Sequence, residues 1–188
     1  MAKGIEGVGG PVRLVVTGQD PKTGKSVFAS DSKVDPIVLS LVPGPGFHRL
    51  WGSDEPPTLP TDGTQPSTPR YFPGPGGYRF GFFSLAPDET GIPADLDIGA
   101  AFAELQEKLP GMSDVMEPDA PGMHTTDTVD FEVVLSGEVW LELDDGAEVH
   151  LQPGDCVVQN GTRHAWHNKS KEPVTLFVAL LGAERKPS

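Results

Sequence analysis

The sequence has a single cysteine, Cys156, among its 188 residues. A disulfide within the chain is therefore excluded, and a reducing compartment is the simpler expectation. No stretch approaches the ~18 apolar residues that a membrane span needs. Residues 1–11 are rich in glycine and lack the charged-then-apolar order of a secretory signal. These absences predict a cytoplasmic protein without a membrane segment.

Basic residues are also scarce. Lysine and arginine number 14 against 27 acidic residues, which gives a formal net charge of −13. Such a charge disfavours binding to the phosphate backbone of nucleic acids and to anionic membrane surfaces. The expected partners are therefore a small molecule and a second copy of the chain.

Several catalytic signatures are missing. The sequence contains no G-x-S-x-G elbow, no G-x-x-x-x-G-K-[ST] loop and no dinucleotide-binding glycine pattern after a strand, because proline interrupts its glycine-rich stretches. Serine-hydrolase and nucleotide-dependent activities are therefore disfavoured.

Glycine and proline are abundant, with 23 and 20 copies. This composition favours many turns between short strands, and the length suits one folded unit. From residue 131 onward the pattern becomes regular, with Asp-Gly and Asn-Gly turns between apolar runs. We predict an antiparallel sheet or closed barrel with strands at FEVVLS (131–136), EVWLEL (138–143), AEVHL (147–151), CVVQ (156–159), HAWHN (164–168) and PVTLFVALL (173–181).

The first half of the chain is less regular. We expect a hairpin of strands 12–17 and 26–29, a short apolar run at 37–42 and a strand at 47–51. Residues 52–69 are expected to form a surface loop, with a lid over a binding site as the less favoured alternative. Only residues 95–109 have a helical pattern, and its apolar stripe is expected to face the core: Ile98, Phe102, Leu105 and Leu109.

One segment places several polar side chains on one face. If residues 123–132 are extended, His124, Thr126, Thr128 and Asp130 point the same way, since alternate strand residues share a face. His164, Trp166 and Asn168 share a face by the same rule. On neighbouring strands of a barrel, His124, Asp130 and His164 would converge. Two imidazoles and a carboxylate suit one divalent ion such as Fe, Zn, Mn or Ni.

These segments resemble the two motifs of the cupin superfamily. Residues 122–137 (GMHTTDTVDFEVVLSG) resemble the first motif, with its histidine, acidic ligand and closing glycine. Residues 154–168 (GDCVVQNGTRHAWHN) resemble the second, with its Gly-Asp turn, histidine and asparagine. The resemblance implies a mostly β protein, a cupin double-stranded β-helix or jelly-roll barrel at 116–182. Residues 1–115 would add N-terminal strands, a loop and one short helix packed on it.

The match to the cupin motifs departs at three positions. Thr126 stands where the family usually has a second histidine, Asp130 where it has glutamate, and Gln159 where it often has proline. Two interpretations stay open. Either His124, Asp130 and His164 bind a metal while Thr126 holds a water or the substrate, or the barrel has lost tight metal binding.

The resemblance implies a metal-dependent enzyme that acts on a small oxygenated organic substrate, of the dioxygenase, decarboxylase, isomerase or dehydratase type. Asp130 and Thr126 are the candidate catalytic residues. The alternative is a non-catalytic small-molecule-binding or sensor cupin, and a storage barrel is a weaker third. Small barrels of this family usually cover their exposed strand edges by dimerisation, so the resemblance also implies a homodimer. The candidate pocket residues are Trp166, Thr128, Tyr78 and Phe80.

Six further residues are predicted to lie outside the site. His48 and His150 are expected to be structural, and His167 to point outward because it alternates with His164. The thiol of Cys156 is expected in the core. Glu132 shares the parity of Asp130 and could replace it, but a solvated or salt-bridged position on the strand is favoured. Asp127 has the opposite parity and is expected to be exposed.

Overall fold

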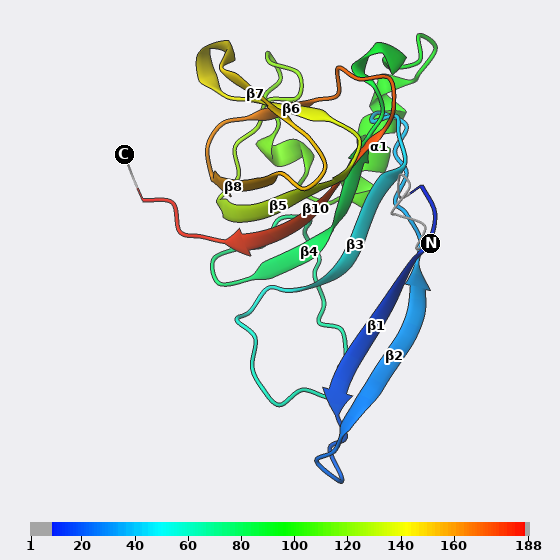
Figure 1. Cartoon of the computed structure of the whole chain (residues 1–188), viewed down its shortest axis with the longest axis vertical. Coiled ribbons are helices and arrows are strands. Elements are labelled where there is room, and N and C mark those ends of the chain that lie inside the picture. The colour runs from blue at the N-terminus through cyan, green and yellow to red at the C-terminus, as the bar shows by residue number, and fades with distance from the viewer. Residues whose placement is uncertain (1–8, 187–188) are drawn as a thin grey trace.

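The computed structural model describes residues 9–186, in which two antiparallel sheets face each other (Figure 1). The larger sheet has five strands and the smaller has three. The order of strands across the larger sheet is β3 (Gly46–Ser53), β4 (Tyr78–Leu85), β10 (Val174–Gly182), β5 (Thr128–Ser136) and β8 (Cys156–Asn160). The smaller sheet contains β7 (Glu148–Leu151), β6 (Val139–Glu142) and β9 (Ala165–His167). The mostly β, jelly-roll barrel prediction is confirmed.

All six strands predicted after residue 130 are present, and the chain passes repeatedly between the two sheets. Strand β10 pairs with both β4 and β5, whereas β6 pairs with β7 and β9. The larger sheet therefore contains two strands, β3 and β4, from the first half of the chain. The predicted boundary at 115/116 cuts through this sheet.

The core lies between the two sheets. Alternate residues of β10, Leu176, Val178 and Leu180, point into it and are at most 5% exposed. From the smaller sheet, Val139 and Leu141 meet them. This two-residue period follows from the pleat of a strand, and it fixes which side of each strand faces the barrel interior.

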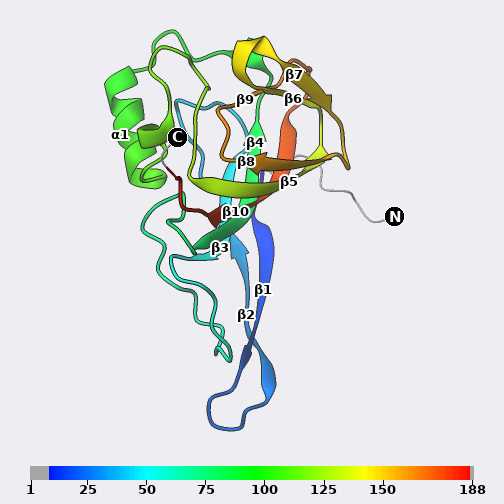
Figure 2. The ribbon, with the colours of Figure 1, turned by 90° about the vertical axis from the view of Figure 1, so that its left-hand side faces the viewer.

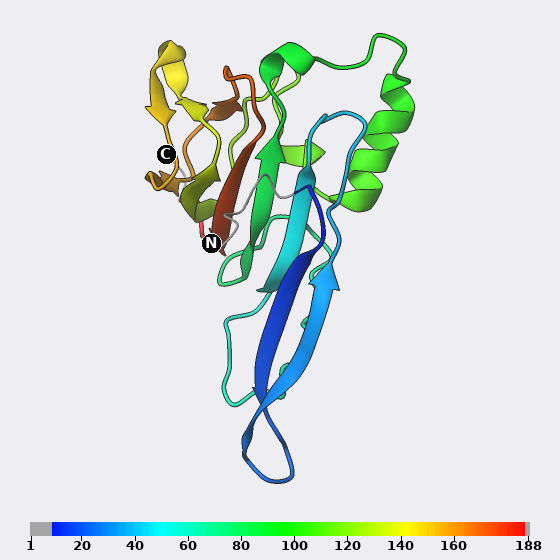
Figure 3. The same ribbon diagram turned by 45° about the vertical axis from the view of Figure 1, so that its right-hand side comes forward.

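A β-hairpin projects from the barrel beyond the end of β3 (Figure 3). It consists of β1 (Val12–Gln19) and β2 (Ser26–Val34), so the hairpin prediction is confirmed with a longer second strand. The loop after β3 lies along this hairpin (Figure 2), and the backbone N–H of Gln19 donates to Thr61 O at 2.8 Å. Residues 37–42 form no strand, and only Ile37 makes an isolated bridge, to Phe47.

The one α-helix of the described residues, α1 (Ile98–Lys108), covers one side of the barrel. The prediction of the apolar stripe is confirmed only in part. Leu105 and Leu109 are buried, whereas Ile98 and Phe102 are 47% and 48% exposed. The helix is turned so that Ala101 takes the buried place. Three short 3₁₀ turns accompany it: η1 (Asp88–Thr90), η2 (Ser113–Val115) and η3 (Asp144–Gly146). None of the helices in residues 9–186 is long and apolar enough to cross a membrane.

Asp97 caps the N-terminus of α1, since its carboxylate accepts a hydrogen bond from Ala100 N at 3.0 Å. The variant Asp97→Ala is expected to lower the free energy of unfolding by about 1 kcal/mol, because one amide at the helix end loses its partner. Urea denaturation measures this change. Asp95→Ala, in the exposed turn before the cap, should leave stability unchanged, and an equal loss in both variants would contradict the capping role.

Candidate functional site

His124 and His164 lie side by side where the two sheets meet. Their backbones form an antiparallel bridge, with His124 N donating to His164 O at 2.9 Å and His164 N donating to His124 O at 3.0 Å. The ring centroids are 4.2 Å apart. His124 precedes β5 of the larger sheet and His164 precedes β9 of the smaller one. The sequence-predicted convergence of these two imidazoles is therefore present in the structure.

The backbone orients both imidazoles in the same way. The Nδ1 atom of His124 lies 2.9 Å from Gly122 O, and the Nδ1 atom of His164 lies 2.9 Å from Thr162 O. A carbonyl only accepts, so Nδ1 carries the proton and Nε2 keeps a lone pair. Burial lowers the pKa of His124, and burial together with the neighbouring His124 lowers the pKa of His164 to about 4. Both rings are therefore neutral near pH 7.

A row of buried polar side chains continues from the histidines into the barrel. The Thr128 hydroxyl donates to Thr126 Oγ1 at 2.8 Å, and both residues are 2% exposed. Asp130 is 3% exposed, and its Oδ1 has no hydrogen-bond partner among residues 9–186. Burial raises the pKa of Asp130 to about 6, although a hydrogen bond from Thr128 opposes the shift. The shared face predicted for Thr126, Thr128 and Asp130 is inward.

Glu132 extends this row, and its predicted solvated position is wrong. The residue is 4% exposed, and its Oε2 has no hydrogen-bond partner within the described part of the chain. Burial, and second the nearby Asp130, raise the pKa of Glu132 to about 8. The signal was available in the sequence, because Glu132 shares the strand parity of Asp130.

Asp130 does not join the two histidines. We searched residues 9–186 for groups of three or more His, Cys, Asp or Glu whose ligand atoms all lie within 4.8 Å of one another. His124, Asp130 and His164 do not form such a group. The parity argument extended one strand from 123 to 132, but β5 begins at Thr128 and His124 stands in a separate bridge. The aspartate is also one methylene shorter than the glutamate usual in the family, and its side chain ends at Thr128.

A different group does meet this distance limit: Glu142, Glu148 and His167. Glu142 and Glu148 are direct cross-strand neighbours of β6 and β7. Their charges are already engaged, because His167 Nε2 lies 2.7 Å from Glu142 Oε2 and Lys169 Nζ lies 2.5 and 2.7 Å from the two Glu148 oxygens. The sequence did not reveal this group because it depends on the pairing of three strands.

Trp166 stands beside His164, as predicted. Its ring is 6.1 Å from that of His164 at an angle of 88°, and 6.0 Å from that of Phe83 in β4. The indole therefore gives the histidine pair an apolar wall.

Tyr78 and Phe80 are not at the site, which corrects the pocket prediction. In β4 the residues Arg79, Gly81 and Phe83 point inward, so Tyr78 and Phe80 belong to the opposite face. Phe80 packs against Phe177 there, with ring centroids 6.2 Å apart.

The positions predicted for the remaining residues agree with the structure in some cases and differ from it in others. Cys156 is exposed rather than in the core, because β8 is the edge strand and turns this residue outward. Asp127 is exposed and paired with Arg185. His48 is 1% exposed and bonds Gly10 O, and His150 stacks on Trp140 at 4.2 Å, so both have structural contacts. His167 follows Trp166 directly in β9 and therefore points to the opposite face of that strand.

A surface cleft of about 540 Å³ reaches the residue next to the histidine pair. Thr126 is one of its lining residues, together with Arg185, Phe72 and Val115. This volume lies within the range of pockets that bind one drug-sized ligand, about 300–1,000 Å³.

Comparison with known proteins agrees with this arrangement. The family model described as "Cupin domain" matches residues 114–180, which include both histidines. Phomopsin biosynthesis cluster protein C' of Diaporthe leptostromiformis is 46% identical over 102 residues, which cover 47% of this chain and 53% of that protein. Oryzines biosynthesis cluster protein J of Aspergillus oryzae is 45% identical over 62 residues, 32% of this chain and 35% of that protein. The chain thus spans about a third to a half of these relatives.

Solved structures also match. The cupin domain of an XRE family transcriptional regulator from Enterobacter cloacae is 20% identical, with a TM-score of 0.36, over 57% of this chain and 83% of that one. An RmlC-like cupin family protein from Methanocaldococcus jannaschii is 13% identical, with a TM-score of 0.36, over 56% of this chain and 70% of that one. On the family match and the motifs, residues 114–180 form a cupin domain.

Proposed function

We propose that the protein is a metal-dependent enzyme in which His124 and His164 bind one divalent ion. The observation that carries this proposal is the pair of neutral imidazoles, 4.2 Å apart, each anchored through Nδ1 on a carbonyl. That anchoring leaves each Nε2 with a lone pair, the form in which histidine binds metals. Two imidazoles accept Fe, Zn, Mn or Ni, with water and substrate completing the coordination.

A bound divalent ion would supply a Lewis acid that polarises an oxygen of the substrate. The chain provides the surroundings. Trp166 forms an apolar wall next to His164, and the Thr126 and Thr128 hydroxyls are hydrogen-bonded to each other on the inward face that also carries Asp130. Asp130 would accept or return a substrate proton, since its pKa of about 6 suits proton transfer near neutral pH. A small oxygenated organic molecule fits this combination of apolar wall and hydroxyl row.

The names of the relatives indicate a setting for the reaction. Both matched proteins are named as members of biosynthesis clusters. We infer that this chain also takes part in the biosynthesis of a small organic compound, by a dioxygenase, decarboxylase, isomerase or dehydratase type of step.

A second candidate is a non-catalytic small-molecule-binding cupin. The observation in its favour is the incomplete ligand set, since Thr126 stands in place of an imidazole and Asp130 lies outside the ligand group of the histidines. Such a barrel would bind its ligand through the threonine row and the cleft beside it, without a metal.

Metal analysis of the purified full chain tests the first candidate. We expect about one divalent ion per chain in the wild type, and a decrease to about a tenth or less in His164→Ala, because one of two protein ligands is lost. His167→Ala is the matched control, since it alters the other carboxylate and histidine group and should keep the metal.

Two results would overturn the proposal. If His167→Ala loses the metal and His164→Ala keeps it, the ion belongs to the group on the outside of the smaller sheet. If the wild type, incubated with excess Fe²⁺, Zn²⁺, Mn²⁺ or Ni²⁺ and then dialysed, keeps no ion, the non-catalytic candidate replaces the enzyme.

A further inference from the structure

The tail that follows β10 begins at the edge of the larger sheet where the two histidine-bearing segments lie (Figure 1). Gly182, the last residue of β10, pairs with the first residue of β5, and the last residue of β8 pairs with the second residue of β5. His124 stands four residues before β5 begins, and His164 stands four residues after β8 ends. The tail therefore starts beside both segments. Its first contact is a hydrogen bond from Ala183 N to Asp127 O at 2.8 Å.

Arg185, in this tail, contacts both segments with one guanidinium. Its Nη2 donates to Thr126 O at 2.8 Å and to Gly161 O at 3.0 Å, and its Nε donates to the Asp127 carboxylate. Thr126 is the second residue after His124, and Gly161 is the third before His164. We call these contacts of Arg185 the clamp. A single nitrogen thus joins the two chain segments that carry the histidines.

The turn at Gly161 lies directly against the backbone of the other segment. Its φ of 59° is in the left-handed region that favours glycine. A Cβ atom here would lie 3.0 Å from Thr126 O and 3.2 Å from both Thr128 O and Arg185 Nη2. Two carbonyl oxygens cannot hydrogen-bond each other, so a donor between them is needed to link the segments at this point. Arg185 supplies that donor.

The clamp acts on groups that orient the site. Thr162 follows Gly161 directly, and its carbonyl is the one that orients the imidazole of His164 through Nδ1. On the other segment, the Thr126 side chain is 2% exposed, and its hydroxyl accepts the hydrogen bond from Thr128. Fixing the carbonyls of Gly161 and Thr126 therefore fixes the backbone on both sides of the histidine pair.

We propose that Arg185 is a positioning residue that holds His124 and His164 at the separation at which they bind an ion. This inference rests on the proposed metal site. Because that site has only two imidazole ligands, its affinity depends strongly on how well the metal-free protein already aligns them. An arginine suits the task, since its planar fork reaches the Asp127 carboxylate with Nε and both carbonyls with Nη2.

Amide hydrogen exchange of the chelator-treated, metal-free full chain tests the clamp without any metal. The readouts are the amides of His124 and His164, each of which donates to the carbonyl of the other. In Arg185→Ala both should exchange about tenfold faster, because the bridge opens more often. Arg13→Ala is the matched control, since Arg13 also forms an exposed fork on a carboxylate, that of Asp31 in the hairpin β1–β2. It should keep the wild-type rates.

Arg185→Lys separates positioning from simple attachment of the tail. Lysine keeps a positive charge opposite Asp127 but has no planar fork, so its exchange rates should stay close to those of Arg185→Ala. In a titration with Zn²⁺, Arg185→Ala should bind about tenfold more weakly than the wild type and Arg13→Ala equally well. Circular dichroism checks that all variants are folded.

Three results would overturn the proposal: wild-type exchange of the two amides in Arg185→Ala, wild-type exchange in Arg185→Lys, or wild-type Zn²⁺ affinity in Arg185→Ala. Failure of the metal site itself has a different signature. If the wild type binds no ion but the two amides still exchange faster in Arg185→Ala and Arg185→Lys, the clamp on the histidine pair is supported and the proposed metal-dependent function is wrong.

Discussion

Arg79→Ala is expected to lower the free energy of unfolding by about 3 kcal/mol or more, because one buried and several part-buried acceptors lose their donor at once. The Arg79 side chain is 7% exposed and points inward from β4. Its guanidinium is the contact point of segments that are far apart in the sequence. The variant therefore tests how the long loop after β3 is attached to the barrel.

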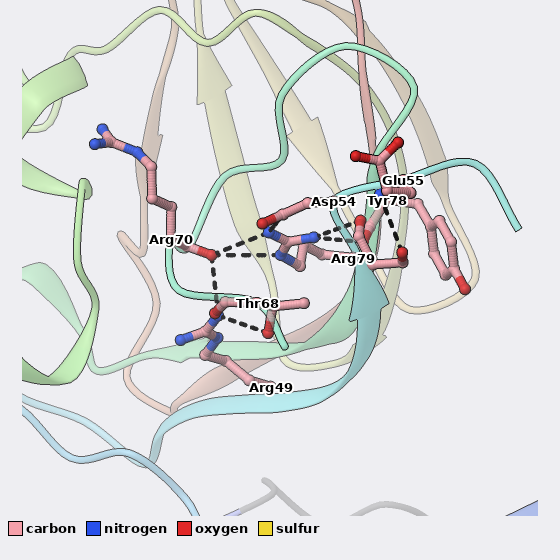
Figure 4. A network of polar contacts seen from close by, with 8 residues as sticks. Arg49, Asp54, Glu55, Thr68, Arg70, Tyr78 and Arg79 are labelled. Carbon is pink, nitrogen blue, oxygen red and sulfur yellow. Dashed lines mark hydrogen bonds and ion pairs between the residues drawn. The ribbon is translucent and has the colours of Figure 1, made fainter. Parts of the chain in front are cut away.

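The contacts of Arg79 are shown in Figure 4. Its Nη1 donates to Ser53 O at 2.7 Å and to Tyr78 O at 2.9 Å, and its Nη2 forms an ion pair with Asp54. Nη2 also donates to Arg70 O at 3.2 Å. The same guanidinium thus connects the end of β3 with the far end of the loop. An alanine would leave these carbonyls without this donor and open a space beside them.

Arg70→Ala is the control for this prediction. The Arg70 side chain is 61% exposed and forms an ion pair with Asp114. It points away from Arg79 in Figure 4. Its removal should change stability by less than about 1 kcal/mol, as is usual for exposed pairs. Arg79→Lys keeps the charge but not the planar fork, and should fall between the two. Urea denaturation compares them, and equal losses in Arg79→Ala and Arg70→Ala would contradict the role of the buried fork.

The strands after residue 130 could be predicted because their signals are local. Turns such as Asn160-Gly161 interrupt apolar runs, and alternation inside each run identifies a strand. The pairing of these strands could not be predicted in the same way. That β10 lies between β4 and β5 depends on contacts between segments about a hundred residues apart, and no local pattern encodes them.

The candidate site, like the fold, could be predicted only in part. The pairing of His124 with His164 follows from the cupin motifs, and the structure contains it. The inclusion of Asp130 required one continuous strand from 123 to 132. The chain leaves the strand geometry before Thr128, so the two-residue period cannot be carried across. Tyr78 and Phe80 were misplaced for a related reason, since the side of the barrel that β4 presents depends on its pairing with β10.

Buried acids were the hardest feature to predict. A glutamate in a strand is usually solvated, and the sequence offers no partner for Glu132. Its burial follows from an outer face that is apolar, which turns the polar residues of β5 inward. The same reversal explains why the only thiol, Cys156, is exposed.

Glu132→Gln is expected to make stability less dependent on pH. Burial raises the pKa of Glu132 from its usual 4.5 to about 8. The protonated form is therefore favoured in the folded state, so its contribution to stability is fully present below about pH 4.5. It is lost at about 1.4 kcal/mol per pH unit as the pH rises toward 8. The upper limit of this loss is on the order of 5 kcal/mol.

Glutamine cannot ionise, so the variant should lose this slope between pH 5 and 8 and become more stable than the wild type at pH 8. A net gain of about 1–2 kcal/mol is expected there, because the amide NH₂ also lacks a buried partner and reduces the benefit. Near pH 4 the wild type should be equal or more stable, since both side chains are then neutral. Urea denaturation over this pH range measures the slope, with Glu107→Gln on the exposed side of α1 as control. If Glu132→Gln and Glu107→Gln keep the same slope as the wild type, the inward carboxyl of Glu132 is not a buried, protonated acid.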